Sequence, residues 1–463
     1  MSITLIQPRH SYAPDEGLGH VYMPSSLFVA GSRLLSAGCD VEFQDLNFSP
    51  LKPTRPQVGI NLVGAPYIPV VIELLEKLRS QHGDKLQSIL GGQVLKGLSS
   101  EQFIKLFGGS TLHGNDDRTL ATAVQLDLRD LPTPEEVSLV PALEKIPQEQ
   151  LKQYLSHEFS FYLSQGCKYA CDFCAAVRTF KDPVTGWSTR ALEVYRDMEK
   201  VERDLKFLVQ KAKEFGIEKL QIYLSNLDLF QSPEQLEEFA LTVRRVRESN
   251  QGFSLMIRGL STVDSFLRVH QFQPNVLEAV VDSGLFRLGF GVDGATPLVW
   301  QRTRKGHNST DKCIKAIEIA STIYGLTTET LMVFGHPDID DERSLALAVD
   351  FSNDMFNRFH SIPRPQVAKN FIPGNNGWIE ARNQTTIEEL MSDPRVFQAL
   401  DFLAEASSVT HRDRSHREAV NRAFHSLCEN PESPSTQIIP ILPRMTDTQI
   451  RRIRKQNEGK YDL

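Results

Sequence analysis

The chain has 463 residues, of which 40% are hydrophobic and 24% charged, and its formal net charge is −7. This length allows two or three domains, each with its own core. The negative charge is spread along the chain and argues against nucleic acid as the main partner. No apolar run reaches the length of a transmembrane helix, and residues 1–8 do not resemble a signal peptide. We therefore expect a cytoplasmic protein with no membrane partner.

Residues 1–125 are predicted to alternate between short strands and amphipathic helices. The strands are expected at 3–7, 41–45, 58–63, 86–90 and 111–113, and the helices at 25–37, 69–81 and 99–107. Short apolar strands that alternate with helices predict a parallel, doubly wound, Rossmann-like sheet. Ligands of such sheets bind at the carboxyl ends of the strands, which here include residues 64–67 and 91–93.

A linker is expected at residues 126–157, and a second series of strands and helices follows it. Its strands are predicted at 159–164, 219–225, 253–258, 286–293, 327–334 and 366–371. Six such units predict an open, partial (βα)6 barrel over residues 158–390, not a closed eight-fold barrel. Residues 391–463 are predicted to form a helical C-terminal region, and the sequence assigns no role to it.

Three of the six cysteines lie within eight residues, directly after the first strand of the second series: Cys167, Cys171 and Cys174. Three thiolates in one loop can ligate three irons of a [4Fe–4S] cluster and leave the fourth iron open. Structural zinc usually takes four ligands, and no fourth one stands nearby. A redox pair of Cys171 and Cys174 would leave Cys167 unexplained. The pattern therefore favours an iron–sulfur cluster, and Cys313 and Cys428 are expected to be core residues.

This Cys-x3-Cys-x2-Cys loop after a barrel strand resembles that of the radical S-adenosylmethionine (SAM) superfamily. The resemblance implies that SAM binds the open iron and is cleaved to a 5′-deoxyadenosyl radical. Phe173, before the third cysteine, matches the hydrophobic position against the adenine. Arg258, at the predicted end of the third strand, looks like the residue that pairs with the SAM carboxylate.

Three further positions carry the resemblance along the later strands. Asp293 lies in a Gly-Val-Asp-Gly segment similar to the family motif whose acid approaches SAM. Gly335 lies in a strand-five motif that the family places beside the adenine. Ser225 falls where the family binds the SAM amine, although this stretch departs from the usual Gly-Gly-Glu.

The N-terminal region resembles the cobalamin-binding domain that is fused to many radical SAM enzymes. The matching features are residues 38–41 (Gly-Cys-Asp-Val), the paired glycines 91–92 and the turn 114–117. The residues implied to border the cofactor are Gly64, Tyr67, Gly91, Gly92 and Gly114. Asn47 stands where many cobalamin domains carry an axial histidine, a departure that members of the fused class often share. The alternative is a flavodoxin-like domain that has lost its cofactor.

The two resemblances together imply a cobalamin-dependent C-methyltransferase that acts on an unactivated carbon of a small molecule or peptide in secondary metabolism. One SAM would methylate cobalamin, and a second would yield the radical. The alternatives are a rearrangement or cyclisation, with or without cobalamin, and a protein that holds a cluster without turnover. Only Cys39 precedes the three-cysteine loop, so a single cluster is expected. The implied electron donor is external, such as flavodoxin or ferredoxin, and no catalytic residue is assigned.

Overall fold

The structure is a computed structural model, and it describes part of the chain. The described residues are 2–9, 23–62, 64–92, 94–95, 98, 100–114, 117–169, 171–174, 193–369 and 405–429. Among them, no helix is long and apolar enough to cross a membrane.

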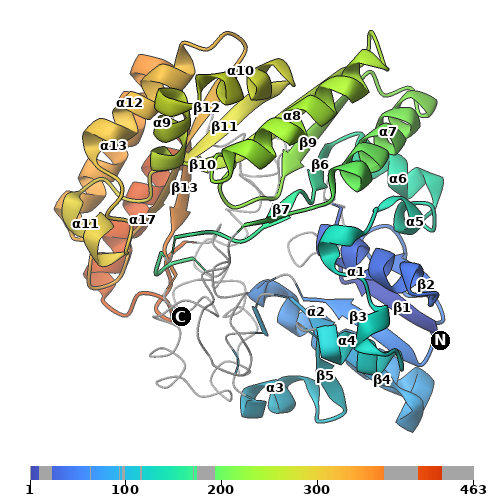
Figure 1. Ribbon diagram of the computed structural model, residues 1–463. Coiled ribbons are helices and arrows are strands. Elements are labelled where there is room, and N and C mark those ends of the chain that lie inside the picture. The colour runs from blue at the N-terminus through green and yellow to red at the C-terminus, as the bar shows by residue number, and fades with distance from the viewer. Residues whose placement is uncertain are drawn as a thin grey trace.

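The N-terminal part is a five-stranded parallel sheet with helices on both faces (Figure 1). Its strands are β1 (Ser2–Gln7), β2 (Asp40–Asp45), β3 (Gln57–Asn61), β4 (Gln87–Gly91) and β5 (Thr111–His113), and its helices are α1 (Ser25–Ser36), α2 (Ile68–His82), α3 (Ser100–Phe107) and α4 (Asp117–Ala123). The strand order β2-β1-β3-β4-β5 is the flavodoxin-like arrangement. All strands are parallel, and the chain switches from adding strands on one side of β1 to adding them on the other side, beginning with β3. The predicted doubly wound sheet is confirmed.

Both faces of this sheet are buried, which explains the nearly continuous apolar character of its central strands. Along β1, Ile3 and Leu5 belong to the core beneath α1 and α4, whereas Ile6 belongs to the core beneath α2 and α3. Since neighbouring side chains of a strand point to opposite faces, one short strand contributes to both layers.

A linker with two short helices, α5 (Val140–Leu143) and α6 (Gln148–Leu155), packs against both halves of the protein. Tyr154 of α6 donates a hydrogen bond to Asp45 at the end of β2, with an O–O distance of 2.6 Å. Its ring meets those of Phe28 and Phe48 edge-on. One hydrophobic cluster runs from Phe28 through the linker into the second half, so the two halves share a core.

The second half is a six-stranded parallel sheet in the order β13-β12-β11-β10-β9-β6. The strands are β6 (Glu158–Phe161), β9 (Lys219–Leu224), β10 (Ser254–Thr262), β11 (Leu285–Gly291), β12 (Thr327–Phe334) and β13 (Ile362–Val367). The helices are α7 (Met198–Glu214), α8 (Pro233–Glu248), α9 (Val263–Phe272), α10 (Pro274–Asp282), α11 (Pro297–Arg302), α12 (Thr310–Ser321) and α13 (Glu342–Phe359). They form an arc around the sheet (Figure 1). Successive strands are neighbours throughout, so the predicted open (βα)6 half-barrel is confirmed.

The C-terminal region contributes helix α17 (Arg414–Glu429), which packs on α13 and β13. Between β6 and α7, the short antiparallel pair β7 (Ser164–Gln165) and β8 (Val194–Tyr195) stands apart from the half-barrel sheet.

Two predicted strands were placed wrongly. The third strand does not end at Arg258 but continues to Thr262, which pairs with Gly291 of β11. The last strand begins at Ile362 rather than 366, and residues 370–371 of the prediction lie outside the described residues. Pro363 and Pro365 concealed this strand, because proline cannot donate a ladder hydrogen bond. They are tolerated in β13 because it is an edge strand with a single neighbour, β12.

A network of ion pairs, joined by a cation–π contact from Tyr223, crosses the interior of the half-barrel with one side chain from each strand. The members are Glu158 (β6), Tyr223 (β9), Arg258 (β10), Arg287 (β11), Glu329 (β12) and Arg364 (β13). Arg258 donates to Glu158 at 3.0 Å and to Glu329 at 2.8 Å. Arg364 reaches the other oxygen of Glu329 at 3.1 Å. Burial alone would raise the pKa of Glu329, but Arg364 and Arg258 hold it below its usual value.

The substitution Glu329→Gln should destabilise the protein by about 3–5 kcal/mol, because it leaves buried arginines without their shared counter-ion. The measurement is urea unfolding of the variant against the unaltered chain. Glu238→Gln, at an exposed position of α8, is the matched control and should change stability by less than about 0.5 kcal/mol. Equal effects of the two substitutions would show that the network does not stabilise the half-barrel.

Candidate functional site

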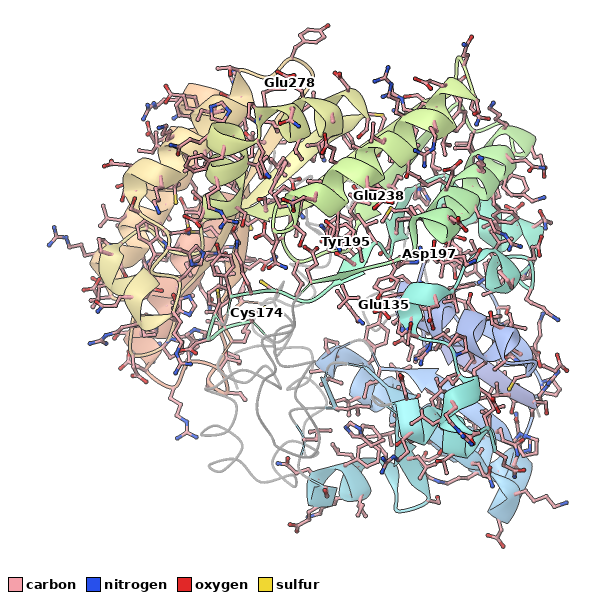
Figure 2. The ribbon with its side chains drawn as sticks, viewed as in Figure 1. Glu135, Cys174, Tyr195, Asp197, Glu238 and Glu278 are labelled. Atoms are coloured by element: carbon pink, nitrogen blue, oxygen red, sulfur yellow. The ribbon has the colours of Figure 1, made fainter. Side chains whose placement is uncertain are left out.

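The three clustered cysteines lie in the loop that follows β7. Gly166 turns this loop with a φ of +108°, and the N–H of Cys174 donates to the carbonyl of Cys171 at 3.2 Å. None of the three forms a disulfide, and burial raises the pKa of Cys167 to about 12 and that of Cys171 to about 11. In Figure 2, Cys174 lies on the lower side of the half-barrel.

Within the described ranges, no three His, Cys, Asp or Glu side chains already converge closely enough to hold a metal ion. The cysteines share one short loop, so their thiols would have to turn towards one another, and lose their protons, on binding a cluster.

A second loop, which joins α11 to α12, braces the cysteine loop. The N–H of Asp172 donates to the carbonyl of Thr303 at 3.0 Å. The rings of Tyr169 and His307 are stacked with their centroids 4.1 Å apart. Sequence analysis did not identify this brace, because nothing in the pattern links residues 303–308 to a loop about 130 positions earlier.

Asp293 forms a buried ion pair with Lys305 of the bracing loop. Its other oxygen accepts a hydrogen bond from the N–H of Val333 at 3.2 Å. Burial alone would lower the pKa of Lys305, but Asp293 and Cys171 raise it, so the ammonium stays charged. The same ammonium lies 5.8 Å from the ring centre of Phe173, within range of a cation–π contact.

The turn after β9 places two polar side chains beside the end of β10. Asp228 is fully buried and accepts hydrogen bonds from the hydroxyls of Ser261, Thr262 and Ser265, at 3.2, 3.0 and 2.6 Å. Asn226 is 1% exposed, and neither its amide oxygen nor its amide nitrogen has a hydrogen-bond partner among the described residues. Such a group usually has a partner, which in an enzyme can be a ligand.

The cysteine loop is also tied to the β7–β8 pair through a polar chain. The N–H of Lys168 donates to Gln231 at 2.7 Å, and Gln231 donates to Glu193 at 3.3 Å. Ser164 of β7 donates to the other oxygen of Glu193 at 2.6 Å. Burial raises the pKa of Glu193 to about 7.

The turn after β12 contains Gly335, with a φ of +75°. The carbonyl of Gly335 accepts a hydrogen bond from His411 at 2.7 Å, and burial lowers the pKa of His411 to about 3, so its ring is neutral. A side chain at position 335 would meet Val420 of α17. The C-terminal segment 405–429 thus fixes this turn, a role that sequence analysis had left unassigned. Next in the chain is His336, which is buried, with its ring centre 5.5 Å from that of Phe173.

The structure brings together Phe173, Asp293 and Gly335 around the cysteine loop. Ser225 follows β9, and its hydroxyl donates to the carbonyl of Phe161 at 3.2 Å. Arg258 lies about 13 Å before the end of β10, at 3.3 Å per residue. Its charge is balanced there by the network of the half-barrel, and we do not include it in the proposed SAM site.

The glycines predicted to border cobalamin occupy positions that differ in how closely the surrounding backbone packs. Gly92, with a φ of +144°, and Gly114 pack so closely against the carbonyls of Leu62 and Leu90 that a Cβ would overlap with them. Gly91 ends β4, and its carbonyl accepts the N–H of Leu62 at 2.6 Å. Glycine at positions 92 and 114 is therefore required by the packing of the sheet, whereas Gly91 contributes a backbone hydrogen bond to it.

The remaining positions of this region lie in the loops after β2 and β3. Among the described residues, only Pro66 lies near a side chain added at Gly64, and Tyr67, just before α2, is half-buried. The side chain of Asn47 donates to Asp45 at 2.7 Å and to the carbonyl of Pro8 at 3.3 Å. Asn47 is therefore turned into its own loop.

The family model described as the radical SAM superfamily matches residues 161–348. These residues include the cysteine loop and most of the half-barrel, so this part of the chain is a radical SAM domain. No curated protein matches the chain in a sequence comparison.

Two solved structures share the fold over most of the chain. The radical SAM methyltransferase TsrM from Kitasatospora setae, with cobalamin and a [4Fe–4S] cluster bound, superposes with a TM-score of 0.59 at 14% identity, over 83% of this chain and 75% of TsrM. The cobalamin-dependent SAM radical enzyme OxsB, with aqua-cobalamin and SAM bound, gives 0.59 at 15% identity over 99% of this chain. This chain spans 61% of the length of OxsB.

Glu193 should make the stability of the protein depend on pH. Its pKa is raised in the folded state from 4.5 to about 7, so the unfolded chain loses this proton first as the pH rises. Stability should therefore fall between about pH 4.5 and 7, by roughly 1–3 kcal/mol, and stay low above that range. The substitution Glu193→Gln removes the titrating carboxyl group. The variant should therefore be more stable than the unaltered chain at pH 8 but not at pH 4.5.

The check is urea unfolding of both proteins at the two pH values, with Glu238→Gln as the matched control. A difference between Glu193→Gln and the unaltered chain that is the same at both pH values would contradict the assignment.

Proposed function

We propose that the chain is a cobalamin-dependent radical SAM enzyme that methylates an unactivated carbon of a small molecule or peptide in secondary metabolism. The observation that carries the proposal is that one chain combines a radical SAM half-barrel with a flavodoxin-like sheet, and that the two share a core. TsrM and OxsB, whose structures hold cobalamin, support it because they share this architecture.

Cys167, Cys171 and Cys174 would hold the cluster. Their spacing fits a three-thiolate site with one open iron, and Lys305 places a buried positive charge beside them. When bound, such a cluster supplies the electron for reductive cleavage of SAM. The chain contributes the frame: residues 303–308 hold the loop from one side, and Gln231 with Glu193 holds it from another.

SAM would lie at the carboxyl ends of the strands, across the mouth of the half-barrel. The orphaned amide of Asn226 fits the methionine end of SAM, whose amino group donates and whose carboxylate accepts. Phe173 offers a flat apolar face for the base. Asn226 is buried and Phe173 half-buried, and limited access of water protects a reactive radical from side reactions.

Cobalamin would bind to residues 1–125, at the carboxyl ends of β1 and β3, where the sheet order reverses. The open backbone at Gly64 allows the close approach of a large ring. Asn47 is tied to Asp45 and Pro8, so the loop after β2 offers no axial ligand from this position. When bound, cobalamin supplies a transferable methyl group. An external flavodoxin or ferredoxin in the cytoplasm would supply electrons.

Replacing any one of the three loop cysteines by alanine should reduce the iron bound per chain from about four atoms to near zero. The measurement is iron and sulfide analysis after anaerobic reconstitution, together with 5′-deoxyadenosine formation from SAM. Cys313→Ala, at a buried position in α12, is the matched control and should keep its iron. Retention of iron by all three loop variants would contradict the assignment of the cluster to these cysteines.

Anaerobic purification from cells supplied with cobalamin should yield about one cobalamin per chain, because one doubly wound sheet offers one switch-point crevice. Methyl transfer would then appear as a substrate mass gain of one methylene unit. A protein that cleaves SAM but retains no corrinoid would instead support the alternative, a cobalamin-independent rearrangement or cyclisation.

A further inference from the structure

The segment that braces the cysteine loop concentrates positive charge on one flank of the half-barrel. Residues 302–315 contain five cations and one acid, a net charge of +4, whereas the whole chain has a net charge of −7. Burial lowers the pKa of His307 to about 4, so its ring adds no charge at neutral pH. Lys305 is buried beside Asp293, and the other four cations are exposed: Arg302, Arg304, Lys312 and Lys315.

This flank touches the cysteine loop. Arg304 forms an ion pair with Asp172, which stands between Cys171 and Cys174 in the sequence, with an N–O distance of 3.3 Å. The side chain of Arg304 is 65% exposed. A molecule that contacts Arg304 from solvent is therefore one ion pair away from the loop of the predicted cluster.

A second contact joins the flank to the same loop through α9, which packs on α12 (Figure 1). Lys312 of α12 pairs with Asp264 of α9 at 3.2 Å. Asp264 also accepts a hydrogen bond from the hydroxyl of Tyr169, in the cysteine loop, at 3.2 Å. The positive charge thus meets the loop at two places, Asp172 and Tyr169.

The acids of the flank lie behind its cations. Asp172 and Asp264 are each 27% exposed, against 65% for Arg304 and 47% for Lys312. Three more exposed cations form no ion pair within the described part of the chain: Arg268, Arg302 and Lys315. Two exposed acids, Asp311 and Asp338, stand against these five exposed cations, so the outer surface remains positive.

The place of this charge indicates the kind of partner. Reductive cleavage of SAM takes one electron from outside the chain, and a protein that delivers it has to dock beside the cluster. A positive surface speeds the encounter with an acidic protein and orients it. Encounters between electron-transfer proteins are weak and bury little surface, so a few exposed charges are enough to direct them.

We propose that the flank formed by Arg268, Arg302, Arg304, Lys312 and Lys315 is the docking surface for an acidic electron-transfer protein of the flavodoxin class. One electron passes from the reduced flavin of this partner to the oxidised cluster, and no bond is made or broken in the step. This inference rests on the proposed function and names the face through which its electron enters.

The test is the rate of cluster reduction, followed by anaerobic stopped-flow absorbance with two reductants. One is a reduced acidic flavodoxin, and the other is photoreduced deazariboflavin, which is small and uncharged. The double variant Arg302→Glu/Lys315→Glu reverses two cations that form no ion pair. It should slow reduction by flavodoxin at least about tenfold at low ionic strength, and change reduction by deazariboflavin by less than about twofold. Raising the ionic strength from ~0.01 to ~0.15 M should slow the unaltered enzyme with flavodoxin and narrow this difference.

The matched control is Lys219→Glu/Arg244→Glu, which reverses two exposed cations at the amino end of β9 and in the last turns of α8. It should keep the flavodoxin rate. An unchanged flavodoxin rate in Arg302→Glu/Lys315→Glu overturns the inference, and so does an equal loss in the control or with deazariboflavin. Formation of 5′-deoxyadenosine by the unaltered enzyme with deazariboflavin tests the proposed function separately, because that reductant needs no docking surface.

Discussion

The half-barrel depends on how its concave face is filled. Helices cover the outer face, and no second layer of helices can cover the inner face if the mouth is to stay open. The inner face therefore carries a polar side chain from every strand, charged in all but β9, and the arginines among them meet at the fully buried Glu329. Most of these ions are desolvated, so the network is stable only because each buried charge meets a partner of opposite sign. The candidate site lies beyond this network, at the carboxyl ends of the strands.

The site is assembled from distant segments because a loop of three cysteines cannot hold its own shape. The loop is braced by residues 303–308, by Gln231 and Glu193, and by the Phe173–His336 contact. The C-terminal segment 405–429 closes the last side through His411 and Val420. A group that receives and transfers single electrons needs such a fixed, dry frame, since the protein contributes orientation and exclusion of water more than acid–base chemistry.

The N-terminal sheet is coupled to this frame through the linker rather than through the sheets themselves. Tyr154 joins α6 to the end of β2, and Arg196 and Asp204 form a fully buried ion pair that holds the linker on α7. Asp204 also accepts from Ser138 and from the N–H of Leu139, so the start of α5 is fixed to the first helix of the half-barrel. These buried polar contacts add to the hydrophobic cluster that the two halves share.

The sequence by itself determined both folds and the cysteine loop. Periodicities of apolar residues report burial directly, and the three cysteines are close in the chain, so neither needs tertiary information. The predicted bounds of β10 and β13 were wrong. Pairing with β11 extends β10, and the edge position of β13 allows its prolines. Only the tertiary structure decided the partners of Asp293, the place of Arg258 and the role of residues 405–429. Each of these depends on residues that lie between 12 and 100 positions apart, and a local pattern carries no information about which of them meet.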